Sequence, residues 1–212
     1  MVHETYDYLT ARIAKGRLGD VRRFLAEDGR DRVRQAGGTL WGCWLGAGSI
    51  GWADDQLIAV VAWPAAPPAS GDASAWLSEA PASGVADVDA ERLRATIRPE
   101  EPHPLRAGGV LAHRWFELED PADFDELLTL SAEAWPAFES AYEASIEGFF
   151  RSVGDPREVL LVTRYASLAE WERSRQVRQA DTGDLAEARR RFVRRQQLTR
   201  RQVVRIGPLL PV

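Results

Sequence analysis

The chain has 212 residues, 45% of them hydrophobic, and a formal net charge of −5 at pH 7. Such a chain is long enough for one large domain or two small ones with a real core. The acidic balance argues against a nucleic-acid partner, which would need a clustered basic surface. We find no signal segment, no apolar run of membrane-spanning length and a single cysteine, Cys43, so we expect a cytoplasmic protein.

The first half, residues 1–98, is predicted to run strand, helix, strand, strand, helix, strand. Alternating residues predict the first strand, helical spacing predicts the first helix, and a continuous apolar run predicts a strand buried on both faces. Gly37 and Gly38 end the first helix. In order, the predicted elements are residues 5–13, 18–36, 39–45, 56–63, 74–79 and 85–98.

The second half, residues 109–212, repeats this order after a proline-rich junction at 99–108. Asp120 followed by Pro121 marks a helix start, and Ser167 with Glu170 forms a capping-box pattern. The predicted elements are strand 109–118, a helix to about residue 142, strands 145–153 and 158–165, a helix from 167, an additional helix at 184–198, and strand 201–206.

The two halves match most closely in their middle strands. Gly42 aligns with Gly148, and Trp63 aligns with Tyr165. A βαββαβ unit forms a four-stranded antiparallel sheet with two helices on one face, the ferredoxin-like arrangement. We therefore predict an α+β protein of two tandem ferredoxin-like domains, packed face to face as a pseudo-dimeric α/β barrel.

Segments of the second half, mainly within residues 109–175, resemble the NIPSNAP family. The resemblance is carried by Leu111–Leu118, Phe124, Leu127, Gly148–Ser152, Gly154, Asp155, Val159–Val162, Arg164, Tyr165, Ser167, Leu168 and Arg173–Arg175. The chain departs from the family's pattern at Ala112, where an acid is frequent, and at Thr163, where Trp is frequent. The resemblance implies the dimeric α/β-barrel fold rather than a defined activity.

The sequence contains no phosphate loop, metal-ligand spacing or nucleophile elbow, so we predict no metal and no cofactor. His113 is the candidate catalytic residue because it lies within a predicted strand, on the same face as Trp115. A half-buried structural histidine is the alternative. The predicted ligand-binding residues are Trp115, Arg114, Arg164, Tyr8, Trp41 and Trp44, with either arginine suited to a carboxylate or propionate.

These residues predict a pocket in the second half that binds a small apolar or aromatic molecule, with His113 and Trp115 on its wall. By fold analogy, the function would be a cofactor-independent monooxygenase or isomerase. A non-enzymatic scaffold or interaction protein is the first alternative, and a haem-binding barrel is the second. Whether the protein is an enzyme, and whether it is a monomeric pseudo-dimer or a homodimer, stays open.

Seven arginines between Arg189 and Arg201 invite a nucleic-acid interpretation, but acidic residues precede them and the whole chain is acidic. We predict that the protein shows no tight, salt-sensitive retention of DNA or RNA in filter-binding or mobility-shift assays. Retention that weakens steeply with added salt would contradict this interpretation.

Overall fold

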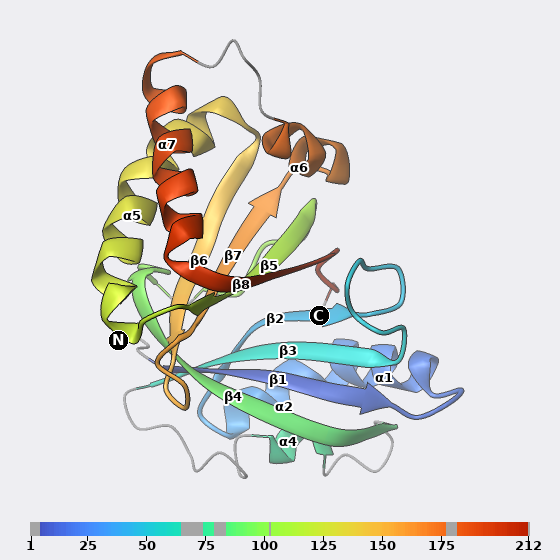
Figure 1. Cartoon of the computed structure of the whole chain (residues 1–212). Coiled ribbons are helices and arrows are strands. Elements are labelled where there is room, and N and C mark those ends of the chain that lie inside the picture. The colour runs from blue at the N-terminus through green and yellow to red at the C-terminus, as the bar shows by residue number, and fades with distance from the viewer. Residues whose placement is uncertain (1–4, 65–73, 79–83, 102, 177–181, 212) are drawn as a thin grey trace.

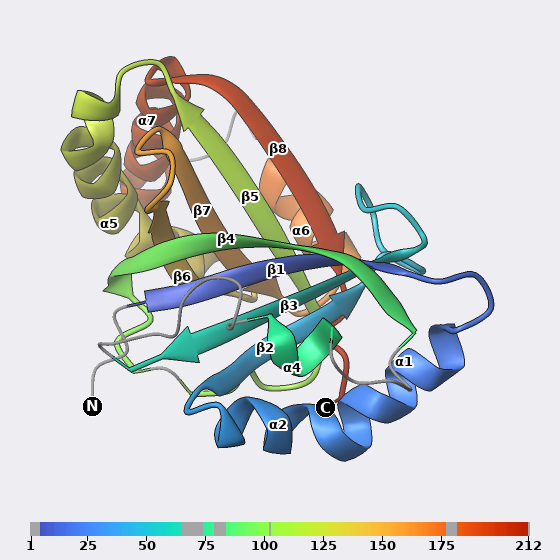
Figure 2. The ribbon, with the colours of Figure 1, turned by 90° about the horizontal axis from the view of Figure 1, so that it is seen from below.

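A computed structural model describes residues 5–64, 74–78, 84–101, 103–176 and 182–211. Residue 79, the last of the predicted helix 74–79, and residue 102 of the predicted junction lie outside these ranges. The described strands form one eight-stranded sheet in the order β2-β3-β1-β4-β6-β7-β5-β8. The helices cover the outer faces of its two halves (Figures 1 and 2).

The first half follows the predicted order of elements. The predicted helix at 18–36 is divided by a π-helical turn, so that α1, η1 and α2 follow each other without a loop. The bounds are β1 (Thr5–Ile13), α1 (Leu18–Phe24), η1 (Leu25–Gly29), α2 (Arg30–Gln35), β2 (Thr39–Leu45), β3 (Gln56–Trp63), α4 (Ala75–Ser78) and β4 (Val85–Arg98).

In the second half, two helical segments begin directly after the predicted N-cap residues, Asp120 and Ser167. The Asp120 carboxylate accepts a hydrogen bond from the Ala122 N–H, and the Ser167 hydroxyl accepts one from the Glu170 N–H. The bounds are β5 (Val110–Leu118), η2 (Pro121–Asp123), α5 (Phe124–Ala141), β6 (Ala144–Ser152), β7 (Glu158–Tyr165), α6 (Leu168–Arg175), α7 (Gly183–Gln197) and β8 (Thr199–Gly207).

Each half has its four strands in the same order: β2-β3-β1-β4 in the first half and β6-β7-β5-β8 in the second. All pairings within the halves are antiparallel. This is the strand order of the ferredoxin-like unit, and the predicted fold class is confirmed. Because β4 also pairs with β6, the two sheets are continuous, and the proposed division into two domains stays a prediction.

The strand register confirms the alignment of the two halves. Gly42 pairs with Val60, and Gly148 pairs with Val162, each immediately after a β-bulge. The bulge inserts one residue, and an aromatic side chain packs over the glycine that follows. A Cβ atom would lie 2.6 Å from the Trp44 ring at position 42 and 2.3 Å from the Phe150 ring at position 148. In both halves, glycine after the bulge therefore leaves the space that the aromatic ring occupies.

The two sheets enclose an aromatic-rich interior that is distinct from the two layers beneath the helices. Strands β4 and β6 join along one side, and a bridge between Ile50 and Ile206 links the loop after β2 to β8 on the other. An ion pair also connects the halves. The Arg98 guanidinium at the end of β4 donates to both carboxylate oxygens of Glu139 on α5. The interior thus contains side chains from both halves.

We expect Gly42→Ala and Gly148→Ala each to lower the free energy of unfolding by about 1–3 kcal/mol, because the added methyl group overpacks a buried ring. Urea denaturation of the purified variants measures the change. Gly19→Ala is the control, since nothing lies within 4 Å of its Cβ position on helix α1. Equal stability of all three variants would show that the bulge glycines do not make room for the rings.

Candidate functional site

Strand β5 has two buried faces with different surroundings. Leu111, His113 and Trp115 face the interior between the sheets, whereas Arg114 and Phe116 face the helices of the second half. This division follows from the pleat of the strand, which turns successive side chains to opposite faces. Each predicted residue on β5 is therefore assigned to one of two separate environments.

His113 is fully buried and surrounded by aromatic rings. Its Nδ1 atom lies 3.2 Å from the hydroxyl of Tyr8, and ring centroids of Trp44 and Trp52 lie 4.3 and 5.1 Å away, both in edge-to-face geometry. Tyr8 pairs with Val60 and His113 with Val162, so these two residues are structural counterparts in the two halves. The contact between them holds the halves together at equivalent positions of β1 and β5.

The protonated form of His113 is strongly disfavoured. Burial lowers the pKa of His113 to about 3, and the positive charge of Arg205 contributes in the same direction. Its Nε2 atom has no hydrogen-bond partner within the described part of the chain. A neutral, enclosed imidazole fits the alternative interpretation, a structural histidine, better than it fits a base exposed to substrate.

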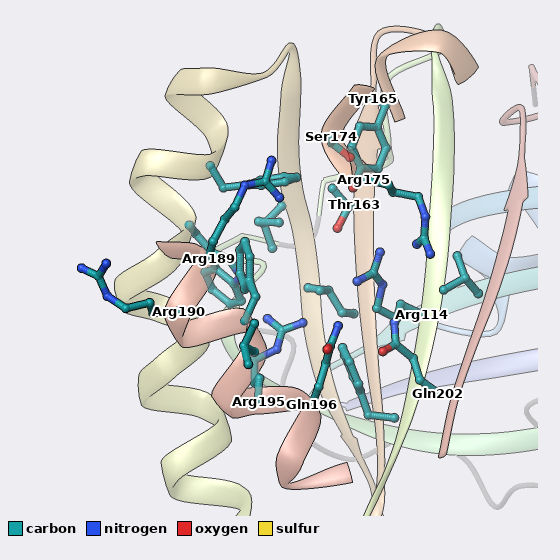
Figure 3. A pocket seen from close by; sticks show the side chains of 18 of the residues that line it. Arg114, Thr163, Tyr165, Ser174, Arg175, Arg189, Arg190, Arg195, Gln196 and Gln202 are labelled. Carbon is teal, nitrogen blue, oxygen red and sulfur yellow. The ribbon is translucent and has the colours of Figure 1, made fainter. Parts of the chain in front are cut away.

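A cavity of about 720 Å³ lies on the opposite face of β5, between the second-half sheet and helices α5, α6 and α7 (Figure 3). Its apolar lining comes from the sheet and from the facing sides of α5 and α7. The apolar residues are Phe116, Trp135, Phe138, Ile146, Leu161, Ala186, Phe192, Val193 and Val204. A cavity of this size, whose wall combines these apolar residues with polar ones, has the general form of a small-molecule site.

Five arginines line the cavity: Arg114 from β5, Arg175 from α6, and Arg189, Arg190 and Arg195 from α7 (Figure 3). Arg190 pairs with Glu187, and Arg189 donates to the Tyr142 hydroxyl. Arg195 is only 4% exposed. Its guanidinium donates to the hydroxyl of Ser131 at 3.1 Å and lies over the rings of Phe116 and Phe192, at 4.8 and 5.1 Å from their centroids. These contacts fix the guanidinium without neutralising its charge.

The arginines raise the positive potential of the cavity together. Burial lowers the pKa of Arg195 to about 9, and the charge of Arg114 adds to this effect. The pKa of Arg114 is also lowered, first by burial and then by Arg175. Among the described residues, the lining includes no aspartate, glutamate or histidine. Positive charge in this cavity is therefore not balanced by an acidic side chain of its wall.

Tyr165, at the end of β7, is the one tyrosine in the described lining. Burial raises the pKa of its hydroxyl, while Arg114 and a hydrogen bond with Ser174 oppose the increase. The neutral hydroxyl therefore predominates near neutral pH, where it can donate a hydrogen bond to a ligand. Thr163, Gln196 and Gln202 add further polar groups to the wall.

Most of the other arginines in the 189–201 cluster pair with carboxylates. Arg194 donates to Glu126 on α5, Arg191 lies 2.9 Å from Glu133, Arg190 pairs with Glu187, and Arg200 pairs with Glu117. These pairs lower the density of free positive charge on the outer surface, which agrees with the predicted lack of nucleic-acid binding. Arg195 instead points inward.

The structure separates the residues predicted for the site. Arg114 lines the second-half cavity, and Tyr8, Trp44, His113 and Trp115 meet in the interior between the sheets. His113 and Trp115 do not line this cavity: both lie on the far side of β5 from it, because the strand's alternation directs Arg114 and Phe116 into it. Their role in ligand binding stays a prediction.

The remaining two predicted residues lie elsewhere. The Arg164 guanidinium donates to Glu147 at 2.7 Å and to the Gly108 carbonyl, so its charge is already paired. Trp41 lines a smaller cavity of about 370 Å³ near the junction and the end of the chain, together with Leu105 and Leu209. Its ring also packs against Tyr6 and Phe150.

Sequence reasoning missed Arg175, Arg195 and Tyr165 as lining residues. The signal for Arg195 was its spacing on helix 183–197, where it shares a buried face with Ala188 and Phe192. An arginine on the buried, apolar face of a helix is unusual unless its guanidinium has a hydrogen-bonding or charged partner inside the fold. The surrounding arginines obscured this signal, because a run of charges usually indicates a solvated face.

The equivalent region of the first half is filled. The register places Leu9 where the second half has Arg114, Val61 where it has Thr163, and Trp63 where it has Tyr165. Leu9, Val61 and Trp63 are fully buried and pack with Trp76 beneath helices α1 and α2. Of the two layers between sheet and helices, the one in the second half therefore contains the cavity and the polar side chains.

Comparisons with known proteins support the architecture. Neither a protein-family model nor a curated protein sequence matches the chain. A provisionally assigned monooxygenase from Fusobacterium nucleatum is similar in structure, with a TM-score of 0.66, 7% identity, and coverage of 99% of this chain and 94% of that chain. A mutant chlorite dismutase from Candidatus Nitrospira defluvii has a TM-score of 0.61, 11% identity and coverage of 100% and 93%.

The chain has the dimeric α/β-barrel fold. One polypeptide supplies both halves of the barrel, as the sequence repeat predicted. A NIPSNAP family protein from Agrobacterium tumefaciens is also among the structural neighbours, with 22% identity, a TM-score of 0.40, and coverage of 52% of this chain and 91% of that chain.

In the described ranges, no group of three or more His, Cys, Asp or Glu side chains is arranged to hold a metal ion. None of the helices there is both long and apolar enough to cross a membrane.

We expect His113 to make the protein less stable in acid. Between its folded pKa of about 3 and the unfolded value of about 6.5, the unfolded chain binds more protons, so the free energy of unfolding falls as the pH decreases. From about pH 6.5 to about pH 5 this contribution is about 2 kcal/mol.

Urea denaturation across this pH range measures the effect. His113→Leu should lose less stability than the wild type, whereas His103→Gln, at an exposed position in the junction, should follow the wild type. Parallel curves for His113→Leu and the wild type would show that the histidine is not held in its neutral form.

Proposed function

We propose that the protein binds a small apolar or aromatic molecule in the cavity between the second-half sheet and helices α5, α6 and α7. The observation that carries this proposal is the cavity of about 720 Å³, whose counterpart in the first half is filled by Leu9, Val61 and Trp63. Close packing is the default for a protein interior. A large space kept in only one of two equivalent layers favours a ligand.

The lining is suited to an aromatic ligand. Trp135, Phe138 and Phe192 offer ring faces and edges, and Tyr165, Thr163 and Gln202 supply a few polar groups that can fix its orientation. A wall that combines apolar area with polar groups in this way suits a small molecule that carries both. Burial of the apolar part would provide most of the affinity.

Within this function, we propose a cofactor-independent oxygenase or isomerase as the reaction class. The structural similarity to a provisionally assigned monooxygenase supports it. Arg114 and Tyr165 would orient an oxygen atom of the substrate, and the aromatic wall would exclude water. The described lining offers no carboxylate or histidine as a general base, which favours binding without catalysis as the alternative. Oxygen uptake and spectral change of added hydroxylated aromatic compounds separate these possibilities: uptake indicates an oxygenase, conversion without uptake an isomerase, and neither indicates binding without catalysis.

Haem binding is the second alternative, and the described lining does not fit a histidine-ligated haem. His113 lies across β5 from the cavity, and His103 is exposed in the junction. Tyr165 is the one described lining side chain of a type that serves as an axial ligand. Addition of haemin followed by absorption spectroscopy tests this alternative, and a Soret band lost in Tyr165→Phe would support it.

We expect the neutral fluorescent probe phenylnaphthylamine to bind this cavity, and Thr163→Trp to weaken its binding at least about tenfold by filling the space. Thr163 is buried in the sheet and directed into the cavity (Figure 3). The NIPSNAP pattern frequently has Trp at this position, which favours folding of the variant. Fluorescence titration measures the dissociation constants.

Val153→Trp is the matched control, because it adds the same ring at a residue that is 54% exposed. It should bind the probe as the wild type does. If the wild type does not bind the probe, or Thr163→Trp binds it equally well, the cavity is not a ligand site. The scaffold or interaction function would then be favoured.

A further inference from the structure

We propose that the natural ligand is an organic anion: an aromatic or aliphatic body carrying an acidic group that pairs with Arg114 and Arg195. This inference rests on the proposed function, because it names the class of molecule held in the same cavity. The ligand's negative charge would replace the carboxylate partners that these arginines lack in the described part of the chain.

The first support is the burial of Arg195. A guanidinium that is 4% exposed is normally paired, because transfer of a charge out of water is costly without a counter-ion. Arg195 has instead a neutral hydroxyl, Ser131, and two aromatic rings as its close contacts. No described carboxylate lies within ion-pair distance of it.

The second support is the convergence of like charges. Arg114 and Arg175 extend toward each other from β5 and α6, and Arg195 approaches from α7 (Figure 3). Neither Arg114 nor Arg175 forms an ion pair with a described carboxylate. Arg114, Arg175 and Arg195 carry like charges that repel each other, and an anion bound between them would offset this repulsion. On the same helix, Arg190, which also lines the cavity, pairs with Glu187, and Arg191 and Arg194, outside the lining, have carboxylate partners as well.

The third support is the contrast with the first half. Leu9 occupies the position equivalent to Arg114, and Trp63 occupies the position equivalent to Tyr165. The same fold is therefore compatible with an apolar residue at this point of the sheet. An arginine at position 114 is not required to build the ferredoxin-like unit, which favours a role for its charge in binding.

The geometry also defines the shape of the ligand. The acidic group would lie near Arg114 and Arg195, where a guanidinium can hold a carboxylate, sulfonate or phenolate through charge-assisted hydrogen bonds. The apolar body would lie against Trp135, Phe138 and Leu161. The ligand is thus amphipathic, with its charge at one end.

Two fluorescent probes with the same ring system test the inference: phenylnaphthylamine, which is neutral, and anilinonaphthalene sulfonate, which adds one sulfonate. We expect the wild type to bind the sulfonate at least about tenfold more tightly than the neutral probe. Arg195→Met and Arg114→Met should each remove most of that preference, measured as the ratio of the dissociation constants of the two probes. Arg191→Met, which removes a surface ion pair on α7, should retain it.

A second measurement separates binding from folding. Because Arg195 is a buried cation without a described carboxylate partner, Arg195→Met should leave the ligand-free protein at least as stable as the wild type in urea denaturation. The sulfonate should raise the thermal midpoint of the wild type more than that of this variant. A loss of stability without a change in probe preference would make Arg195 a structural residue and overturn the inference.

The outcomes distinguish the two proposals. If neither probe binds in a way that Thr163→Trp prevents, the proposed function fails. If both probes bind there with equal affinity in the wild type, or the two arginine variants keep the preference for the sulfonate, the cavity is a ligand site but the ligand is not selected by its charge. Arg114→Met provides the same test should Arg195→Met fail to fold.

Discussion

The alternation of side chains along β5 is the constraint on which the candidate site depends. Both faces of this strand are covered, one by the opposing sheet and the other by helices α5 and α7. His113 and Arg114 are neighbours in the sequence, yet they lie in separate layers because the pleat turns successive residues to opposite sides. The layer that Arg114 enters contains the cavity, and the layer that His113 enters is packed with aromatic rings.

Pairing of β4 with β6 makes the interior layer a shared structure. Tyr8 and His113, equivalent residues of the two halves, meet there, and Trp44 and Trp52 enclose the imidazole. Neither half alone could bury these rings, so the contact between sheets stabilises both halves through apolar burial. In this layer a histidine contributes packing and one hydrogen bond, at the cost of sensitivity to acid.

The two outer layers of the barrel have diverged in chemistry while their backbones have kept the same register. In the first half, Leu9, Val61 and Trp63 complete a dry core beneath α1 and α2. In the second half, Arg114, Thr163 and Tyr165 occupy the equivalent positions, and a cavity remains between the sheet and α7. One layer thus maintains the fold, and the other holds buried charges that cost stability and favour an anionic ligand.

The sequence by itself determined the repeat, the strand order within each half and the helix starts at Asp120 and Ser167. These features follow from local rules: period-two and helical spacing, turn residues and capping side chains. The repeat even aligned Gly42 with Gly148, because a bulge beneath an aromatic ring requires glycine in both halves. The register of the two hairpins was thereby fixed by residues that are close along the chain.

Only the tertiary structure decided which face of β5 borders a cavity and which arginines remain without a described carboxylate. Apolar residues occur on both faces of this strand in the sequence, with Leu111 and Trp115 on one face and Phe116 on the other, so periodicity could not tell the packed side from the open one. Arg194 pairs with Glu126, whereas Arg195 reaches no carboxylate of the described residues, although the two arginines are adjacent. That difference depends on how α7 packs against α5 and the sheet, a long-range contact that no local pattern encodes.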